Sequence, residues 1–286
     1  MKKKKNKQRS KRGKVLFCIS FFGTLCIASL VYIGIYYGKQ AKAIQQYKEM
    51  QELASTKEET SEVALEVQPL EEEEKHPDTT EQLSKVDLSL RKENQVDFEA
   101  LWNRNGHIYA WIEIPGTQVN YPVLQHPTDD AYYLDHTVDG VSGLPGSIYT
   151  ESVHPKDFTA TNTVLYGHNM KNDSMFGSLH DYESQEALDA NPYVYMYLPD
   201  KTFIYQIFAA SRFSDAYLPE YCDYESEEEF LSYIEEIRTN AVSEDEELEV
   251  SFGSRILTLS TCISNDPTHR FLVEAVLIDE YERIQR

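Results

Sequence analysis

An uncharged, apolar run near the start of the chain sets the first limit on its fold. From Val15 to Tyr37 nearly every side chain is apolar or small, and no charge lies between Lys14 and Lys39. About 20 apolar residues suffice for a helix to cross a bilayer, so this run can span one. A cleaved signal peptide is the alternative, but its apolar core is usually only about 7–15 residues long. We therefore predict one retained transmembrane signal anchor over residues 15–38.

The charges on the two sides of this run are strongly unequal. Nine Lys and Arg residues lie in positions 2–14, and the first acidic residue is Glu49. By the positive-inside rule, residues 1–14 form a cytoplasmic basic tail and everything beyond the span is extracellular. Of 27 basic residues, those nine leave 18 against 48 acidic ones, a formal charge of −30. Such a charge argues against nucleic acid as a partner. We predict a single-pass protein of the cell membrane.

Residues 39–87 have the composition of an extracellular acidic stalk. Glu, Lys, Thr, Ser and Pro dominate residues 51–86, with four consecutive Glu residues at 71–74. This composition buries little apolar surface, so we expect the stalk to be largely disordered. An outward extension of the membrane helix over 39–50 is compatible with the sequence. A folded domain then covers residues 88–286.

The folded domain is predicted to be mainly β. Short apolar or alternating runs favour strands at 107–114, 119–124, 163–166, 193–198, 202–210, 255–260 and 271–279. The clearest helical pattern is at 227–238, where Phe230, Leu231, Ile234 and Ile237 form one apolar face. Many short strands with few helices favour a closed or nearly closed β-barrel.

Cys262 stands at the end of a predicted strand and is one of four cysteines. Cys18 and Cys26 lie within the apolar span, and Cys222 lies in a segment rich in Tyr and acidic residues. A free cysteine has a pKa of about 8.5, and a nearby cation or histidine favours the nucleophilic thiolate. Arg270, eight residues further on, offers such a cation. Two cysteines make a poor disulfide framework, so we expect a free thiol at Cys262 and an unpaired bystander at Cys222.

His168 is the predicted partner of Cys262. The chain has eight histidines, and His269 is the main competitor because it adjoins Arg270. Neighbouring side chains on a strand point to opposite faces, so His269 faces away from a site that Arg270 faces. His168 therefore remains the candidate general acid and base.

Three segments, in this order along the chain, carry a family resemblance. They are Tyr109-Ala110-Trp111-Ile112 with Ile114-Pro115-Gly116-Thr117 and Tyr121-Pro122-Val123-Leu124-Gln125, then Tyr166-Gly167-His168-Asn169-Met170, then Thr258-Leu259-Ser260-Thr261-Cys262 with Arg270. They resemble class B sortases, the membrane-bound cysteine transpeptidases of Gram-positive bacteria. The resemblance covers about Val96 to Leu277 and implies an eight-stranded sortase β-barrel with peripheral helices. It also implies that the long helix at 227–238 precedes the strand of the catalytic cysteine.

The resemblance assigns catalytic roles to three residues. Cys262 attacks the peptide carbonyl of a sorting signal and holds the acyl group as a thioester. His168 protonates the leaving amine and later deprotonates the incoming amine. Arg270 donates hydrogen bonds to the oxyanion or holds the substrate backbone. We expect no cofactor and no metal, since no cluster of His, Cys and acidic residues with zinc spacing stands out.

The resemblance also points to substrate-binding positions. Leu134, Tyr166, Ser260 and Thr261 match positions that line the class B groove, although such residues are equally common in a core. Asp130 stands where class B sortases usually have Asn, and a carboxylate cannot donate a hydrogen bond as an amide does. This departure puts transfer of the usual family sorting signal in doubt.

The turn after the cysteine departs from the family as well. Class B members often carry an acid two residues after the cysteine, where this chain has Ser264. Asp266 is either its substitute or the opening residue of an Asp-Pro turn, and we favour the turn. The spacing from Cys262 to Arg270 is short for the class and implies a tight connection.

Four functions remain open from the sequence. The favoured one is a cysteine transpeptidase that cleaves a C-terminal sorting signal of secreted proteins and joins them to an amine of a peptidoglycan precursor. The second is a class B pilin polymerase that uses a lysine of another subunit as the amine. A cysteine peptidase that transfers to water and a non-catalytic surface binding domain are the less favoured alternatives.

Overall fold

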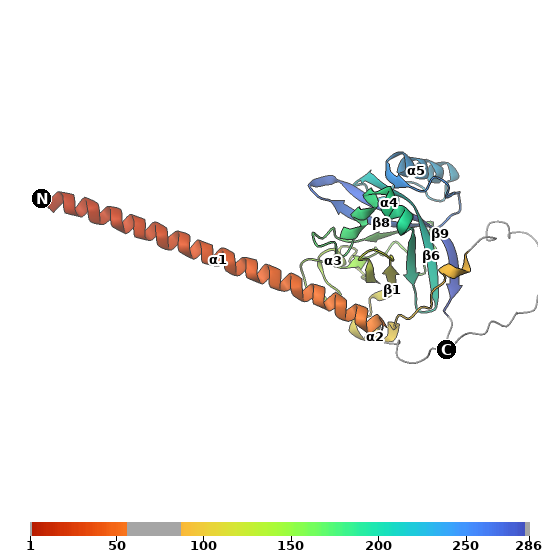
Figure 1. The fold of residues 1–286 in the computed structure, drawn as a ribbon, viewed down its shortest axis with the longest axis horizontal. Helices are drawn as coiled ribbons and strands as arrows, with labels where there is room; N and C mark the ends of the chain where they lie inside the picture. The colour runs from red at the N-terminus through yellow and green to blue at the C-terminus, as the bar shows by residue number, and fades with distance from the viewer. Residues whose placement is uncertain (1, 56–86, 284–286) are drawn as a thin grey trace, which may run out of the picture. The chain divides into compact units, whose positions relative to one another are not determined.

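The chain divides into two compact units, Met1–Gln46 and Tyr47–Arg286. The structure is a computed structural model that describes residues 2–55 and 87–283 (Figure 1), with side chains from residue 21 onward. Residues 56–86 of the predicted acidic stalk lie outside the described residues, as do the side chains of the predicted basic tail.

The first unit consists of one long helix, α1 (Lys2–Ser55), whose last turns belong to the second unit. Its large apolar side chains between Phe21 and Tyr37 are exposed. Within Phe21–Ala54 the helix contains a stretch long and apolar enough to cross a membrane, in line with the predicted apolar anchor. This helix is consistent with a single-pass membrane anchor.

The last two turns of α1 pack within the second unit. Tyr47, Met50 and Ala54 are buried in its main apolar cluster. The Tyr47 hydroxyl donates a hydrogen bond of 2.5 Å to the carbonyl oxygen of Gly146 and lies 3.0 Å from Ser147 Oγ. Burial raises the pKa of the Tyr47 hydroxyl, which keeps it a donor. The ordered part of the second unit therefore includes residues upstream of the predicted start at residue 88.

Eight strands close into a β-barrel, which confirms the predicted fold class. Their order around the barrel is β5-β1-β2-β3-β4-β8-β9-β6, and antiparallel pairing of β5 with β6 closes it. The pairs β2–β3 and β4–β8 are parallel, and the other pairs are antiparallel. The strands are β1 (Ile108–Glu113), β2 (Asn120–Leu124), β3 (Ile148–Tyr149), β4 (Asn162–Tyr166), β5 (Tyr193–Tyr197), β6 (Lys201–Ser214), β8 (Ile256–Ile263) and β9 (Asp266–Glu282).

Two strands have no counterpart in the strands expected from periodicity. β3 is only two residues long, too short to show an alternating pattern. β7 (Ala241–Glu244) pairs with β6 from Ala209 to Ser211, beyond the stretch that pairs with β5. Both strands depend on partners that are distant in the sequence.

Short helices occupy the connections between the strands. They are η1 (Leu88–Leu90), α2 (Phe98–Arg104), α3 (Tyr132–Asp135), η2 (Gly177–Glu183), α4 (Gln185–Ala190), η3 (Leu218–Glu220) and α5 (Glu227–Thr239). Helix α5 is the long helix expected before the cysteine strand, and it lies between β6 and β7 in the chain. Ser226 caps it, since its side chain accepts from the Glu229 N–H, and three acidic residues fill its first turn.

The buried face of α5 differs from the predicted face at one position. Phe230, Ile234 and Ile237 are buried as expected, but Leu231 is 42% exposed and Tyr233 is buried instead. Residues 230, 233, 234 and 237 are three or four apart and share one stripe, whereas residue 231 lies about 100° to the side of residue 230. The prediction for Leu231 was therefore wrong.

Strand β8 has apolar clusters on both of its faces. Leu257 and Leu259 belong to the main cluster inside the barrel, and Ile256 belongs to a second cluster with Phe230 and Tyr233 of α5. Since successive side chains alternate between faces, Cys262 shares the outer face of the strand with Ile256. Cys262 thus lies outside the barrel core.

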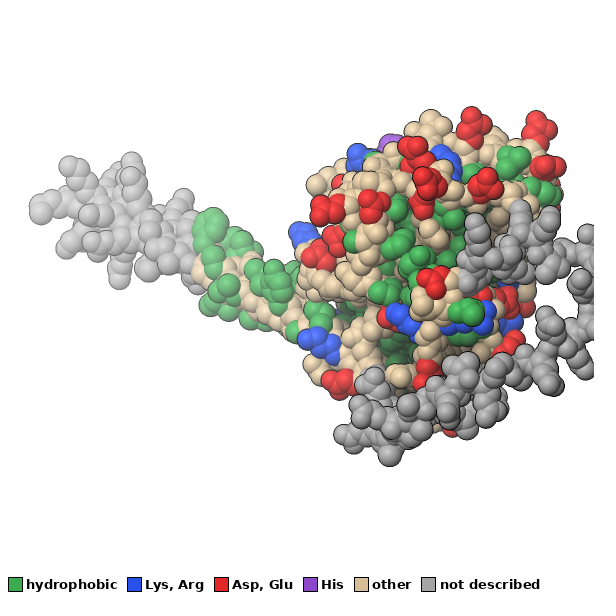
Figure 2. Space-filling view, turned by 45° about the vertical axis from the view of Figure 1, so that its right-hand side comes forward, with side chains coloured by type: hydrophobic (Ala, Val, Ile, Leu, Met, Phe, Trp, Pro, Cys, Tyr) green, Lys and Arg blue, Asp and Glu red, His purple; other side chains and the backbone are tan. Residues whose placement is uncertain are grey.

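The exterior of the second unit is acidic. Figure 2 shows Asp and Glu side chains scattered over the visible face, with fewer Lys and Arg among them. The scattered distribution is typical of a solvated surface and does not single out a nucleic-acid interface.

Candidate active site

His168 and Cys262 lie at the same end of the barrel because β4 and β8 run parallel. Tyr166 pairs with Ser260, so each candidate residue lies two positions beyond a member of this pair. The Gly167 N–H donates to the Ser260 carbonyl oxygen at 3.2 Å, and Thr261 Oγ1 donates to the Gly167 carbonyl oxygen at 2.8 Å. These hydrogen bonds extend the alignment of β4 and β8 as far as His168 and Cys262.

Arg270 is brought to the same place by antiparallel pairing. Cys262 lies opposite Arg270 on β9, and the next pair is Ile263 with Asp266. Only two residues form the turn, and Asn265 adopts a positive φ of 63° there. The connection is as tight as the short spacing predicts.

The register shift between these two pairs leaves three residues of β9 without partners on β8. Residues 267–269 lie between the paired positions Asp266 and Arg270. They turn toward β6, where His269 pairs with Ser214 and the Asp215 N–H donates to the Thr268 carbonyl oxygen at 3.1 Å. This bulge allows a residue eight positions after the cysteine to lie directly across from it.

The Arg270 side chain folds over the bulge. Its Nη1 donates to the carbonyl oxygens of Pro267 and His269, at 3.1 and 2.9 Å. Among the described residues, the contacts of the guanidinium use Nη1, so its N–H groups on Nη2 and Nε can serve another acceptor. Arg270 is thus positioned as a donor beside Cys262.

Asp266 and His269 stabilise the turn. The His269 Nδ1 lies 2.9 Å from Asp266 Oδ2, and Thr268 donates to Asp266 Oδ1 through its N–H and hydroxyl groups. Hydrogen bonds from His269 and then Thr268 lower the pKa of the Asp266 carboxyl. Asp266 accordingly has the contacts of a turn-forming residue, and His269 is engaged away from Cys262.

His168 is oriented by helix α3, which carries Leu134. Its Nε2 lies 2.6 Å from the Leu134 carbonyl oxygen. A carbonyl can only accept, so Nε2 carries the proton and Nδ1 is left to exchange protons. Among the hydrogen bonds of the described residues, none joins His168 to Cys262; such contacts often tighten only when substrate binds.

The predicted substrate-binding residues differ in accessibility. The Leu134 side chain is 47% exposed, Asp130 is exposed, and Tyr166 is partly buried against Tyr149 with ring centroids 5.5 Å apart. Ser260 and Thr261 are buried. The Thr261 hydroxyl is engaged with Gly167, which gives this residue a positional contact within the protein.

Asp130 is engaged with a neighbouring loop. Its Oδ1 accepts from the Ser152 N–H at 2.6 Å and its Oδ2 from the Ser152 hydroxyl at 3.2 Å. These two donors suit a carboxylate, which accepts at both oxygens. An Asn could accept at only one of them.

Sequence patterns did not indicate a cluster of carboxyl and tyrosine groups around Glu151 and Tyr149. Partial burial raises the pKa of the Glu151 carboxyl, and the charge of Asp130 raises it further. A hydrogen bond from Tyr217 has the opposite, smaller effect. Burial likewise raises the pKa of Tyr149, with contributions from Glu151, Asp130 and Cys262. These groups come from segments that are distant in the sequence, so no local motif marks them.

Asn169 and His180 also contact the backbone of Cys262. Asn169 Nδ2 donates to the Cys262 carbonyl oxygen at 3.0 Å, and His180 Nε2 lies 3.1 Å from the same oxygen. In the sequence, the only indication that Asn169 belongs to the site is its place in the segment Tyr166-Gly167-His168-Asn169-Met170. His180 lies on η2, and no sequence motif indicated that it belongs to the site.

The two cysteines of the second unit differ in environment. Both are free thiols; Cys262 is exposed and Cys222 is half-buried. Burial, and secondly the charge of Glu229, raise the pKa of the Cys222 thiol to about 11. Cys222 is therefore a poor nucleophile at neutral pH, in keeping with a bystander.

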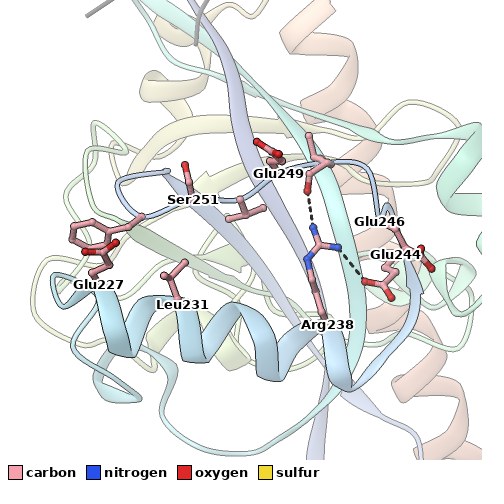
Figure 3. Close-up of a pocket in the computed structure, with 10 residues that line it drawn as sticks. Glu227, Leu231, Arg238, Glu244, Glu246, Glu249 and Ser251 are labelled. Atoms are coloured by element: carbon pink, nitrogen blue, oxygen red, sulfur yellow. Dashed lines mark hydrogen bonds and ion pairs between the residues drawn. The ribbon is translucent and has the colours of Figure 1, made fainter. Parts of the chain in front are cut away.

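A separate groove lies between α5 and residues 244–252 (Figure 3). It encloses about 570 Å³, and it is lined by Glu227, Leu231, Arg238, Glu244, Glu246, Leu248, Glu249, Val250, Ser251 and Phe252. Arg238 joins its two sides by donating to Glu244 Oε2 at 3.0 Å and to the Leu248 carbonyl oxygen at 2.6 Å. None of the predicted catalytic residues lines this groove.

Known proteins with similar sequences and folds share this arrangement of strands. The sortase domain family matches residues 112–278. Sortase B of Listeria monocytogenes is 31% identical over 175 residues, which cover 61% of this chain and 70% of that protein. The structure of sortase B from B. anthracis aligns with a TM-score of 0.62 and 27% identity, over 85% of this chain and 98% of that one. The Staphylococcus aureus sortase B–substrate complex aligns with a TM-score of 0.57 and 29% identity, over 64% and 84% of the two chains.

A barrel with a thiol, a histidine and an arginine at one end of its parallel strand pair defines a cysteine transpeptidase of the sortase type. With its matching domain and relatives, the chain belongs to the sortase family and, within it, to class B.

Proposed function

We propose that this protein cleaves a C-terminal sorting signal of secreted proteins and transfers the acyl group to an amine of a peptidoglycan precursor. The observation that carries the proposal is the strand register around Cys262. The Tyr166–Ser260 pair and the Cys262–Arg270 pair bring His168, Cys262 and Arg270 together from three segments. The Staphylococcus aureus sortase B that aligns with this chain was determined as a substrate complex, which supports a substrate-binding role for this fold.

In the first half-reaction the Cys262 thiolate attacks the carbonyl carbon of the scissile peptide bond. The C–S bond forms, and the negative charge on the former carbonyl oxygen is stabilised by the N–H groups that Arg270 has free. As the tetrahedral intermediate collapses, the C–N bond breaks and the His168 imidazolium gives the proton on Nδ1 to the leaving amine, which leaves a neutral imidazole with its proton on Nε2. The acyl group remains on Cys262 as a thioester.

In the second half-reaction the acceptor amine attacks the thioester carbonyl. His168 takes a proton from the amine, the new C–N bond forms, and the C–S bond breaks to release the Cys262 thiolate. A single histidine with one nitrogen held by the Leu134 carbonyl can serve both steps through Nδ1. An amine gives an amide product, whereas water gives a free acid.

Leu134, Tyr166 and Asp130 form the accessible part of the proposed substrate surface. Exposed Leu134 and the Tyr166 ring offer apolar contacts, and the exposed Asp130 carboxylate accepts from Ser152. Ser260 and Thr261 are buried and immediately precede Cys262 on β8. They support the proposed substrate surface by fixing this backbone, since the Thr261 hydroxyl donates to the Gly167 carbonyl oxygen. The catalytic domain of residues 88–286 is proposed to face the exterior, with residues 1–14 in the cytoplasm and the span at 15–38.

The amine acceptor distinguishes the main proposal from its alternative, a class B pilin polymerase. Both use the same thioester chemistry, and they differ in whether a cell-wall precursor amine or a pilin lysine attacks it. The acceptor preference of the acyl-enzyme therefore decides between them.

The proposal can be tested with the full-length protein in detergent micelles. Wild type and Cys262→Ala are incubated with candidate sorting peptides and examined by mass spectrometry. A thioester on Cys262 that a peptidoglycan-like amine converts into an amide product supports the proposal. Faster release by a lysine-bearing pilin peptide favours the polymerase, and release only by water favours a peptidase. No adduct on wild type with any peptide would contradict transpeptidation of these signals.

A further inference from the structure

The carbonyl oxygen of Cys262 accepts a hydrogen bond from Asn169, whose amide also contacts His180. Asn169 Nδ2 donates to it at 3.0 Å, and His180 Nε2 lies 3.1 Å away. The position coincides with the register shift between Cys262 and Ile263, where β8 and β9 lose their regular pairing. The Asn169 side chain thus fixes the backbone at the point where the regular pairing of β8 and β9 ends.

His180 is itself held on three sides. Its Nδ1 lies 2.9 Å from Glu183 Oε1, its ring stacks on Phe271 at 4.7 Å, and its Nε2 lies 2.9 Å from Asn169 Nδ2. A side chain with both nitrogens engaged and one face covered has little rotational freedom. The imidazole can therefore define the position of the groups that it contacts.

The donors and acceptors of this cluster are consistent with one arrangement of protons. The Glu183 carboxylate only accepts, so the Nδ1 of His180 carries a proton. Nε2 then accepts one N–H of the Asn169 amide, and the second N–H of that amide donates to the Cys262 carbonyl oxygen. Every N–H of the Asn169 amide is used, which determines its orientation.

Asn169 directly follows His168 in the chain. An amide anchored to the Cys262 backbone on one side and to His180 on the other thus ties the segment of the proposed base to the nucleophile. The Thr261–Gly167 hydrogen bond supports the same alignment from the other side of the strand. A catalytic pair that must exchange a proton through a substrate depends on such spacing, since a displacement of about 1 Å can cost about 100-fold in rate.

We propose that Glu183, His180 and Asn169 form a positioning relay that sets the separation of His168 and Cys262. The inference rests on the proposed function, because the relay acts through the transpeptidation pair. None of its three members touches the reacting atoms. Their effect is to keep the Cys262 backbone and the His168 segment in one arrangement during both half-reactions.

The test compares turnover of full-length wild type with His180→Ala, His180→Gln and Asn169→Ala in detergent micelles. We expect His180→Ala to lower kcat about tenfold or more while KM for the sorting peptide changes less than about twofold. A Gln amide can occupy the place of Nε2, so His180→Gln should recover most of the lost kcat. A residue with only a packing role would not be rescued by that change, because Gln cannot replace the ring stacked on Phe271.

A double-mutant cycle separates a relay from two independent contacts. If Asn169 and His180 act as one unit, the Asn169→Ala/His180→Ala double variant is about as slow as the slower single variant. The inference would be overturned if the fold losses in kcat of the two single variants multiplied in the double variant. It would also be overturned if the kcat of His180→Ala equalled that of wild type. Asp181→Asn is the matched control, since Asp181 is an exposed carboxylate on the same helix η2, and it should leave kcat unchanged.

Alkylation of Cys262 by iodoacetamide tests the relay without any peptide substrate. We expect His180→Ala to change the Cys262 alkylation rate at least threefold, with Cys222 as the internal reference. If wild type forms no acyl adduct but the alkylation rate still depends on His180, the proposed function fails and the relay stands. If wild type forms the adduct and neither kcat nor alkylation responds to His180, the relay fails and the proposed function stands.

Discussion

Tyr166 on β4 lies opposite Ser260 on β8 in a parallel pair, and this single register pair brings His168 and Cys262 to one end of the barrel. In parallel strands, equal offsets from a pair reach the same edge of the sheet. A shift of one residue would move every following side chain to the opposite face of the strand. The alignment is reinforced beyond the strand end by the hydrogen bond from Thr261 Oγ1 to the Gly167 carbonyl oxygen.

Thr261→Val removes that hydrogen bond while keeping the shape of the side chain. We expect a loss of about 1 kcal/mol in the free energy of unfolding, because the Gly167 carbonyl loses its donor. We also expect a several-fold lower kcat, since the His168 segment loses an anchor. Thr261→Ser keeps the hydroxyl, so it should retain most of the free energy of unfolding and most of kcat. Equal effects of the two substitutions on kcat would contradict a role of this hydrogen bond.

Arg270 is predicted to act through the geometry of its N–H groups. Arg270→Ala removes a proposed oxyanion donor and should lower kcat about 100-fold. Arg270→Lys keeps the charge but loses the planar fork, so it should recover only a small part of that loss. Steady-state transpeptidation kinetics check both values. Full recovery by Lys would mean that charge alone is required.

The two free thiols should label at very different rates. Cys262 is exposed, whereas burial and the charge of Glu229 raise the Cys222 pKa to about 11. At pH 8 we expect iodoacetamide to modify Cys262 at least about tenfold faster than Cys222, because only the thiolate reacts. Peptide mapping by mass spectrometry gives both rates. Cys222→Ala should leave transpeptidation unchanged, and a loss of activity there would show that Cys222 is no bystander.

Glu274 is a buried carboxyl beneath α5. It accepts from the Tyr233 hydroxyl at 2.8 Å and lies 2.8 Å from Thr258 Oγ1, which is also 2.9 Å from Asn162 Oδ1. A hydroxyl has one hydrogen for these two neighbours, so a protonated Glu274 that donates to Thr258 satisfies the chain of bonds. Burial raises the pKa of Glu274 from 4.5 to about 7, which agrees with a neutral carboxyl.

This pKa shift has a defined effect on stability. The folded state holds the proton more tightly than the unfolded state, so the stabilisation is present below about pH 4.5 and is lost as pH rises through 7. The shift corresponds to on the order of 3 kcal/mol. We expect wild type to lose stability by that amount relative to Glu274→Gln between pH 4.5 and 8.

Denaturant unfolding of both proteins across this pH range measures the difference. The variant is the necessary reference, because His154 has the opposite effect. Burial lowers the pKa of His154 from 6.5 to about 4, so that group adds stability as pH rises from 4 to 6.5. The His154 contribution cancels between wild type and variant. A difference that does not depend on pH would contradict the assignment to Glu274.

The end of α1 should contribute to the stability of the second unit. Met50 is fully buried in the main apolar cluster. Met50→Ala should lower the free energy of unfolding by about 2–5 kcal/mol through the cavity that it creates. Lys48 is exposed on the same helix, and Lys48→Ala should change stability by less than about 0.5 kcal/mol. Similar values for the two variants in micelles would show that the helix end does not pack as described.

The chain's own sequence was enough to establish several features. The uncharged run from Val15 to Tyr37 predicts the apolar helix, because its length and composition alone match a bilayer. Alternation and turn residues located most strands of the barrel, and α5 was evident from its apolar face. Cys262, His168 and Arg270 were recognisable because each stands in a local motif of the sortase family.

Other features were decided only by contacts between distant segments. The two-residue strand β3 exists because β2 and β4 flank it, and Leu231 faces solvent because Tyr233 fills the interface below α5. The packing of Met50 could not be predicted from a segment that resembles a linker. His180 and Glu183 carry no motif, and His180, with Glu183 at its Nδ1, lies beside the Cys262 carbonyl only because η2 folds across the end of β8. Local patterns record which face of an element is apolar, but the partners of a polar side chain depend on the tertiary fold.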